Sequence, residues 1–143
     1  MMEAVRRVLL ADDDPAICSL IDTVLKKGPY KLTTCSDAES ALVAVKREEH
    51  PFDIIICDFM LPGISGIDLI ERLRSDQRTK KTPILMISGH TNYAMGGRAR
   101  TAGANLFLNK PFTISQLRAA VMQLLALPSP GNELLGGAAN TAR

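Results

Sequence analysis

Short strand-like segments alternate with amphipathic ones along most of the chain. Five segments have the composition of strands, being short and rich in branched aliphatic, threonine and aromatic residues. They cover residues 5–11, 30–35, 53–57, 83–88 and 105–108. After its first residue, the segment at 53–57 is a continuous apolar run, which predicts a strand buried on both faces.

Apolar residues between these strands recur at helical spacing, which predicts one helix after each strand. Asp14 and Pro15 supply an N-cap and a favourable first residue for the first helix. Ser36 or Asp37 caps the second helix, and Thr113 caps the last one.

The predicted helix at residues 91–101 is the weakest of the five. Gly96 and Gly97 lie in its middle, and each glycine costs about 1 kcal/mol relative to alanine in a helix interior. Two together cost about 2 kcal/mol, a large share of the stability of one short helix. We therefore hypothesise that this helix is partly frayed.

This alternation of strands and helices predicts an α/β fold, with a five-stranded parallel sheet and helices on both of its faces. Residues 1–127 suit one domain, because a chain of this length buries a sizeable core. Residues 128–143 are rich in Gly, Pro and small polar residues, so we expect a disordered tail or a linker there.

Composition narrows the classes of function. The formal net charge of +2 offers no strong field for nucleic acid or an anionic membrane, and no apolar run reaches membrane-spanning length. The N-terminal apolar run is too short for a signal peptide. Cys18, Cys35 and Cys57 are too scattered for a disulfide or zinc framework, so we expect buried, reduced thiols in a cytoplasmic protein.

Charged and hydroxyl side chains stand at the carboxyl ends of four predicted strands, where open α/β sheets bind ligands. Residues 12–14 are all aspartate and follow the first strand, while Asp58 follows the third. Ser88 ends the fourth strand, and Lys110 comes shortly after the fifth. We expect Asp14 to act as a helix cap rather than as a ligand.

This set of side chains has a chemical logic. Clustered carboxylates raise one another's pKa unless a cation lies among them, and a hard ion that prefers oxygen, such as Mg²⁺, meets that need. With the ion bound, a carboxylate can attack phosphorus and form an aspartyl phosphate. The phosphoryl oxygens then need charge stabilisation, which the ion, a lysine and a hydroxyl group can supply.

Four sequence motifs carry a resemblance to a known family. VLLADDDP, IIICDFMLPGISG, ILMISG and LFLNKPF stand in this order, each at the end of a predicted strand. Together they closely resemble the receiver domains of two-component response regulators, over roughly residues 4–127. The resemblance implies a flavodoxin-like sheet with the strand order 2-1-3-4-5.

The resemblance also assigns roles around the acids. Asp58 resembles the phosphoacceptor of receiver domains. Asp13 would ligate Mg²⁺ directly, Asp12 would act mainly through water, and the backbone carbonyl of Met60 would complete the protein ligands. Lys110 would pair with Asp58 and then with the phosphoryl group.

Three further positions would serve phosphate entry and switching. Ser88 would donate its hydroxyl to a phosphoryl oxygen, and Gly89 would leave room for the phosphate to enter. Phe107 matches the aromatic switch position, where tyrosine is common, so the hydroxyl of that position is missing here. By analogy with the family, the Lys110-Pro111 peptide bond is expected to be cis.

The function implied by the resemblance is a phosphorylation-dependent switch, with no enzyme activity beyond its own phosphorylation and dephosphorylation. The implied phosphoryl donor is a sensor histidine kinase or a histidine phosphotransfer protein. A downstream protein would bind the face formed by the fourth helix, the fifth strand and the fifth helix. No contact with nucleic acid or a membrane is expected of this domain.

Two other classes of protein share part of the pattern. A phosphatase with an aspartyl nucleophile needs a second Asp two residues after the nucleophile, and that position is Met60. A degenerate, phosphate-independent scaffold has no need of the acids, Ser88 and Lys110, all of which are present. A phosphoacceptor receiver therefore remains the leading prediction.

Overall fold

The computed structural model describes residues 4–89 and 93–126, and within them strands alternate with helices as the sequence predicts. The strands are β1 (Arg6–Ala11), β2 (Tyr30–Cys35), β3 (Ile54–Asp58), β4 (Ile84–Ser88) and β5 (Leu106–Asn109). The helices are α1 (Pro15–Leu25), α2 (Ala38–Arg47), α3 (Gly66–Arg74), α4 (Tyr93–Ala102) and α5 (Ile114–Leu125). The tail predicted at residues 128–143 lies outside the described residues.

The strands form one parallel sheet in the order β2-β1-β3-β4-β5. The strand order 2-1-3-4-5 is therefore confirmed. The chain leaves β1 toward β2 at one edge and then crosses back to β3, so the direction of winding reverses between β1 and β3. Sheets of this kind bind ligands at the carboxyl ends of the two strands that flank the reversal.

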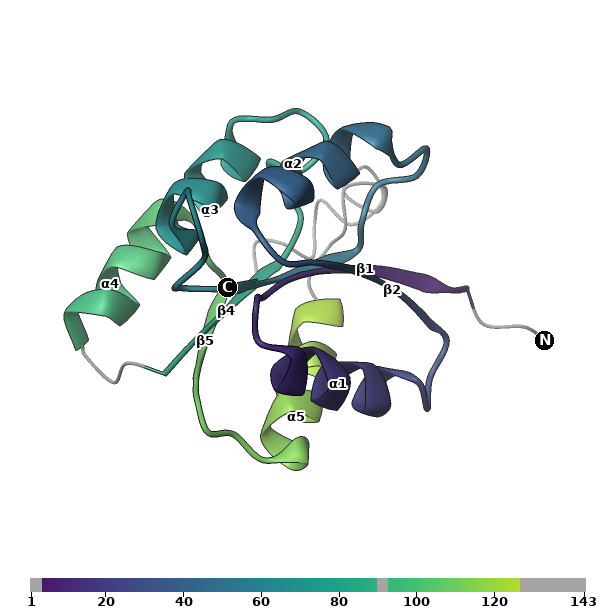
Figure 1. The fold of residues 1–143 in the computed structure, drawn as a ribbon. Helices are drawn as coiled ribbons and strands as arrows, with labels where there is room; N and C mark the ends of the chain where they lie inside the picture. Colours follow the sequence, from purple (N-terminus) through teal and green to yellow (C-terminus); the bar gives the residue numbers. More distant parts are fainter. Residues whose placement is uncertain (1–3, 90–92, 127–143) are drawn as a thin grey trace.

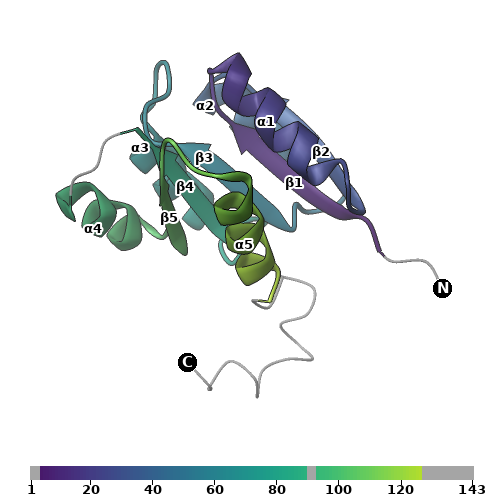
Figure 2. The ribbon, with the colours of Figure 1, turned by 90° about the horizontal axis from the view of Figure 1, so that it is seen from below.

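Helices cover both faces of the sheet, as predicted (Figure 1). α2, α3 and α4 pack on one face against strand residues that include Leu9, Ile55 and Met86. α1 and α5 pack on the other face against residues such as Leu10 and Ile56, and Figure 2 shows both helices on the near side of the sheet. Successive residues of β3 enter opposite cores, which confirms that this strand is buried on both faces.

The helices begin at the predicted caps. The carboxylates of Asp14 and Asp37 accept backbone hydrogen bonds from the first turns of α1 and α2, at 2.9 and 2.7 Å. Asp37, rather than Ser36, is thus the cap of α2. Thr113 caps α5 in a reciprocal capping box. Within the described part of the chain, no helix has the length and apolar character needed to cross a membrane.

Several strand boundaries differ by one residue from the sequence pattern. Asp53 precedes β3, because its carboxylate accepts a hydrogen bond from the backbone N–H of Arg7 at 2.8 Å and closes that end of the ladder. Asn105 precedes β5 in the same way, with its side-chain oxygen 2.7 Å from the backbone nitrogen of Ile84. Asp58 pairs with Ile87 of β4, which makes it the last residue of β3 rather than the first residue of the following loop.

α4 has little apolar packing of its own. Ala99 is its one buried residue among positions 96–102, whose side chains are described. Gly96 and Gly97 lie within the helix, and a Cβ atom built on either glycine would meet nothing within 4 Å. The helix starts beside residues outside the described range, so its fraying stays a prediction.

Replacing Gly96 and Gly97 with alanine is expected to stabilise α4 by about 1 to 2 kcal/mol, because alanine loses less backbone entropy and has room for its methyl group. Amide hydrogen exchange measures the effect. Protection of residues 97–102 should rise in the double variant, while protection of α5 should not change. Equal protection of α4 in the wild type and the variant would show that the helix is not frayed.

Candidate functional site

Asp12, Asp13 and Asp58 converge where β1 and β3 end. The two strands are hydrogen-bonded neighbours, with Ala11 opposite Cys57, so the acids that follow Ala11 meet the acid that ends β3. One carboxylate oxygen from each of the three acids lies within 4.8 Å of the others. Asp12 and Asp58 are buried, with 1% and 4% of their surface exposed, whereas Asp13 is exposed.

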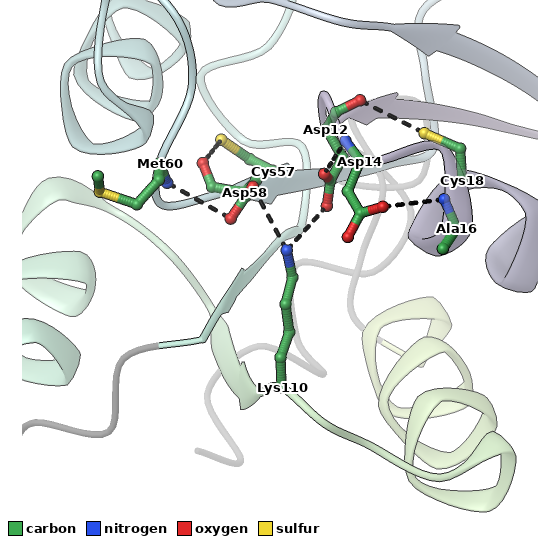
Figure 3. A network of polar contacts seen from close by, with 8 residues as sticks. All are labelled: Asp12, Asp14, Ala16, Cys18, Cys57, Asp58, Met60 and Lys110. Atoms are coloured by element: carbon green, nitrogen blue, oxygen red, sulfur yellow. Dashed lines mark hydrogen bonds and ion pairs between the residues drawn. The ribbon is translucent and has the colours of Figure 1, made fainter.

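Lys110 brings a positive charge to these acids (Figure 3). Its Nζ lies 3.4 Å from Oδ2 of Asp12 and 3.4 Å from Oδ2 of Asp58. The backbone N–H of Lys110 donates to the carbonyl of Ser88 at 2.7 Å, which holds the residue at this edge of the sheet. Its peptide bond to Pro111 is cis, as predicted. One ammonium group against three carboxylates leaves the cluster negatively charged.

One oxygen of Asp12 lacks a hydrogen-bond donor. Oδ1 accepts a hydrogen bond from the backbone N–H of Asp14 at 2.9 Å, but Oδ2 is buried and accepts none within the described residues. Its contact with Lys110 at 3.4 Å is long for a charge-assisted hydrogen bond. A buried, unsatisfied carboxylate oxygen is costly, and a hard cation removes that cost. The donor set of Asp12, Asp13 and Asp58 therefore fits Mg²⁺.

The carboxyl group of Asp58 titrates well above its ordinary range. Burial and then the charge of Asp12 raise the pKa of Asp58 to about 6, against the opposing effects of Lys110 and the backbone N–H of Met60. That N–H lies 3.4 Å from Oδ1 of Asp58. A cation bound here favours the ionised form, so it competes with a proton.

Mg²⁺ affinity is accordingly expected to fall as the pH drops below about 6. The raised pKa means that metal-free Asp58 binds a proton below that pH, and the metal must displace this proton, so the Kd rises by up to about tenfold per pH unit. Above about pH 7 Asp58 is ionised even without the metal, so its protonation should no longer affect the Kd. Isothermal titration across this range measures the Kd, and Asp58→Asn serves as the control that lacks the titrating group. A Kd that stays constant from about pH 7 to about pH 5 would contradict the raised pKa.

The loop after β3 closes tightly on Asp58. The backbone N–H of Gly66 donates to the carbonyl of Phe59 at 3.0 Å, and a Cβ atom on Gly66 would lie 2.2 Å from the backbone oxygen of Asp58. Gly63 has a φ of 78°, in the left-handed region that favours glycine. This loop keeps Met60 beside Asp58 (Figure 3). The metal-ligand role of the Met60 carbonyl stays a prediction.

The remaining predicted site residues lie on or next to β4 and β5. Ser88 is fully buried at the end of β4. Gly89 is exposed, and a Cβ atom there would meet nothing within 4 Å, so the space beside its backbone is open. Phe107 is half-buried in β5 and packs against the core under α2, α3 and α4. Their roles in phosphate binding and switching stay predictions.

Two cysteines lie beside the acidic site. The thiol of Cys18 donates to the backbone carbonyl of Asp12 at 3.3 Å, and Cys18 is half-buried, which corrects the expectation of a buried thiol. Burial, followed by the charge of Asp12, raises the pKa of Cys18. Cys57 is fully buried, its thiol lies 3.4 Å from the backbone oxygen of Asp58, and burial raises its pKa also. Both thiols therefore act as neutral groups that pack beside the acids, a role that no spacing in the sequence signals.

Similarity to known proteins agrees with this geometry. The model of the response regulator receiver domain family matches residues 8–122. The transcriptional activator protein PfeR of Pseudomonas aeruginosa is 36% identical over 121 residues, which cover 83% of this chain and 37% of that protein. The DNA-binding response regulator MtrA of Mycolicibacterium smegmatis is 35% identical over 116 residues, covering 81% of this chain and 49% of that protein. The chain thus spans less than half the length of either relative.

Solved structures show the same fold. The chemotaxis response regulator CheY4 of Vibrio cholerae superposes with a TM-score of 0.80 at 28% identity, covering 85% of this chain and 100% of that one. The receiver domain of the Francisella response regulator 1452 superposes with a TM-score of 0.75 at 29% identity, covering 85% of this chain and 97% of that one.

Proposed function

Since this chain belongs to the response regulator receiver domain family, we propose that it accepts a phosphoryl group on Asp58 in a Mg²⁺-dependent reaction. The observation that carries the proposal is the convergence of Asp12, Asp13 and Asp58, with Lys110 paired to the two buried acids. Three carboxylates gathered at one edge of a sheet destabilise the fold through mutual repulsion. A functional role for the three carboxylates therefore explains their arrangement better than a contribution to the stability of the fold does.

Asp58 is the nucleophile in the proposed reaction. One of its carboxylate oxygens attacks the phosphorus of a phosphohistidine on the donor protein, in line with the P–N bond. That bond breaks, and its electron pair stays on the imidazole nitrogen of the donor. With a pKa of about 6, Asp58 is mostly ionised at neutral pH, as a nucleophile must be. When bound, the metal ion would supply positive charge to the phosphoryl oxygens.

Lys110 supplies a second positive charge in this scheme. Before the reaction its Nζ divides its charge between Asp12 and Asp58, at 3.4 Å from each. Formation of the acyl phosphate removes the charge of the Asp58 carboxylate, so Nζ is released to bind a phosphoryl oxygen. The hydroxyl of Ser88 would bind another, and the open space at Gly89 would admit the phosphate.

Phosphorylation would then shift an existing equilibrium between two conformations. Ser88 and Phe107 lie on the adjacent strands β4 and β5, so movement of Ser88 toward the phosphate can be accompanied by movement of Phe107. The face formed by α4, β5 and α5 would bind a downstream protein in one of the two conformations. The phosphoryl donor would be a sensor histidine kinase or a histidine phosphotransfer protein, and the reaction would take place in the cytoplasm.

Two neighbouring acids provide a matched test of the metal site. Asp13 belongs to the carboxylate cluster, whereas Asp14 caps α1 and lies outside the cluster. Asp13→Asn is expected to weaken Mg²⁺ binding by about 10- to 100-fold, since even residues behind the metal ligands have effects of that size. Isothermal titration and the rate of phosphorylation by phosphoramidate measure the loss. Asp14→Asn keeps the cap and should behave as the wild type. Equal Mg²⁺ affinities in the two variants would refute the assignment.

A further inference from the structure

A cavity of about 170 Å³ lies between α1 and α5, remote from the acidic cluster. The two helices lie side by side on the same face of the sheet (Figure 1). The lining comes from the end of α1, the turn that leads into β2, and the second half of α5. The acids follow β1 and precede α1, so about 15 Å of helix separates them from this end of α1.

The cavity combines apolar and basic side chains. Val24 and Val121 line it, and so does Met122, which leaves 63% of its surface exposed. Lys27 and Arg118 also line it, and neither forms an ion pair with a described residue. No carboxylate is part of the lining. A ligand with an apolar body and a single negative charge would cover the apolar side chains and pair with the cations.

We propose that the segment 133–135 of this chain, Glu-Leu-Leu, occupies the cavity. This segment lies outside the described residues, so the argument for it comes from its sequence and its reach. Glu133 is the only acidic residue after Asp76, and the only large apolar residues after position 127 are Leu134 and Leu135, which follow it directly. The tail thus carries one carboxylate directly beside two apolar side chains. The cavity offers the complement, two cations beside apolar side chains.

The chain is long enough for this return. α5 ends at Leu125, and Arg118 lies seven residues earlier, about 10 Å along the helix axis. Leu134 follows Ala126 by eight residues, which span up to about 26 Å when extended. The intervening segment PSPGN contains glycine and prolines, the residues that favour turns. The segment can therefore fold back along α5 and reach the cavity.

The N-terminal residues 1–3, Met-Met-Glu, are the competing occupant. β1 starts near the cavity, because the backbone N–H of Arg6 donates to the carbonyl of Pro29 at 2.7 Å, next to the turn that lines it. Glu3, however, lies only three residues from Arg6, which offers it a local positive charge. The basic residue nearest to Glu133 in sequence is Arg143, ten positions away. Glu133 is therefore the more available acid for Lys27 and Arg118.

Methyl NMR on the full chain tests the docking directly. The wild type is expected to show nuclear Overhauser contacts between the methyl groups of Leu134 or Leu135 and those of Val24, Val121 or Met122. The double variant Leu134→Ser/Leu135→Ser should lose them and shift the Met122 methyl resonance. Met2→Ser should leave both the contacts and the resonance unchanged. The absence of tail contacts in the wild type, or a Met122 resonance that responds to Met2→Ser instead, would overturn the proposal.

Charge-reversal substitutions test the proposed ion pair between Glu133 and Arg118. Glu133→Lys and Arg118→Glu should each weaken the contacts, and the combination of the two substitutions should restore them. Arg98→Glu, at an exposed arginine of α4, is the matched control and should have no effect. Failure of the combined variant to recover the contacts would overturn the pairing of these two residues. Phosphorylation of Asp58 should be unaffected in all these variants, so this inference and the proposed function can fail separately.

Discussion

Gly66→Ala is expected to lower the free energy of unfolding by about 2 to 3 kcal/mol and to weaken Mg²⁺ binding by the protein that still folds. The new Cβ atom would lie 2.2 Å from the backbone oxygen of Asp58 and 2.9 Å from the Cα atom of Phe59. Both neighbours are backbone atoms at the end of β3, which cannot yield as a flexible side chain would. Relief of the clash must therefore displace the segment that carries Asp58.

Urea denaturation and isothermal titration measure the two effects of Gly66→Ala. Gly97→Ala is the matched control, because it makes the same chemical change where no atom lies within 4 Å of the new methyl group. The control should keep its Mg²⁺ affinity and be no less stable than the wild type. If Gly66→Ala kept both the stability and the Mg²⁺ affinity of the wild type, the close approach of α3 to Asp58 would be contradicted.

Arg74→Met is expected to cost about 3 to 5 kcal/mol of stability, because it removes several charge-assisted hydrogen bonds at once. The guanidinium group donates to the carbonyl oxygens of Gly103, at 2.8 and 3.0 Å, Thr79 at 2.9 Å and Thr82 at 2.7 Å. It also donates to the side-chain oxygen of Asn105 at 3.0 Å. Methionine keeps an unbranched apolar side chain but leaves these acceptors without their donor. The arginine thus joins α3 to the loop before β4 and to the turn after α4.

Urea denaturation measures this loss, and two further variants refine it. Arg74→Lys keeps the charge but offers no planar fork of donors, so an intermediate loss is expected. Arg72→Met removes an exposed arginine two residues earlier on the same helix and should change stability by less than about 0.5 kcal/mol. A loss of less than about 1 kcal/mol for Arg74→Met would show that these hydrogen bonds contribute much less to the free energy of unfolding than their number indicates.

The acidic site could be predicted from the sequence because parallel strands bring their carboxyl ends to one edge. Asp12, Asp13, Asp58 and Lys110 each stand one or two residues after the end of a predicted strand, so their convergence follows from the alternation of elements. The order of the strands, by contrast, could not be predicted from the alternation of elements. Periodicity cannot distinguish one order from another, and the order came from the resemblance of the motifs to a family.

Contacts between distant parts of the chain could not be predicted in this way. Arg74 and Gly103 are 29 positions apart, and only the packing of α3 against α4 brings them together. Gly66 looks like an ordinary loop glycine in the sequence, and its need for a hydrogen atom in place of a side chain appears only when α3 meets the end of β3. The half-exposure of Cys18 likewise depends on how α1 lies against the acidic loop.

The intact mass of the protein after incubation with acetyl phosphate and Mg²⁺ would show whether Asp58 is the phosphoacceptor. The expected result is a single phosphoryl adduct that requires Mg²⁺ and is absent from Asp58→Asn treated in the same way. A folded wild-type protein that gains no adduct would contradict the claim and favour a phosphate-independent scaffold. An adduct that persists in Asp58→Asn would contradict the assignment of the acceptor residue.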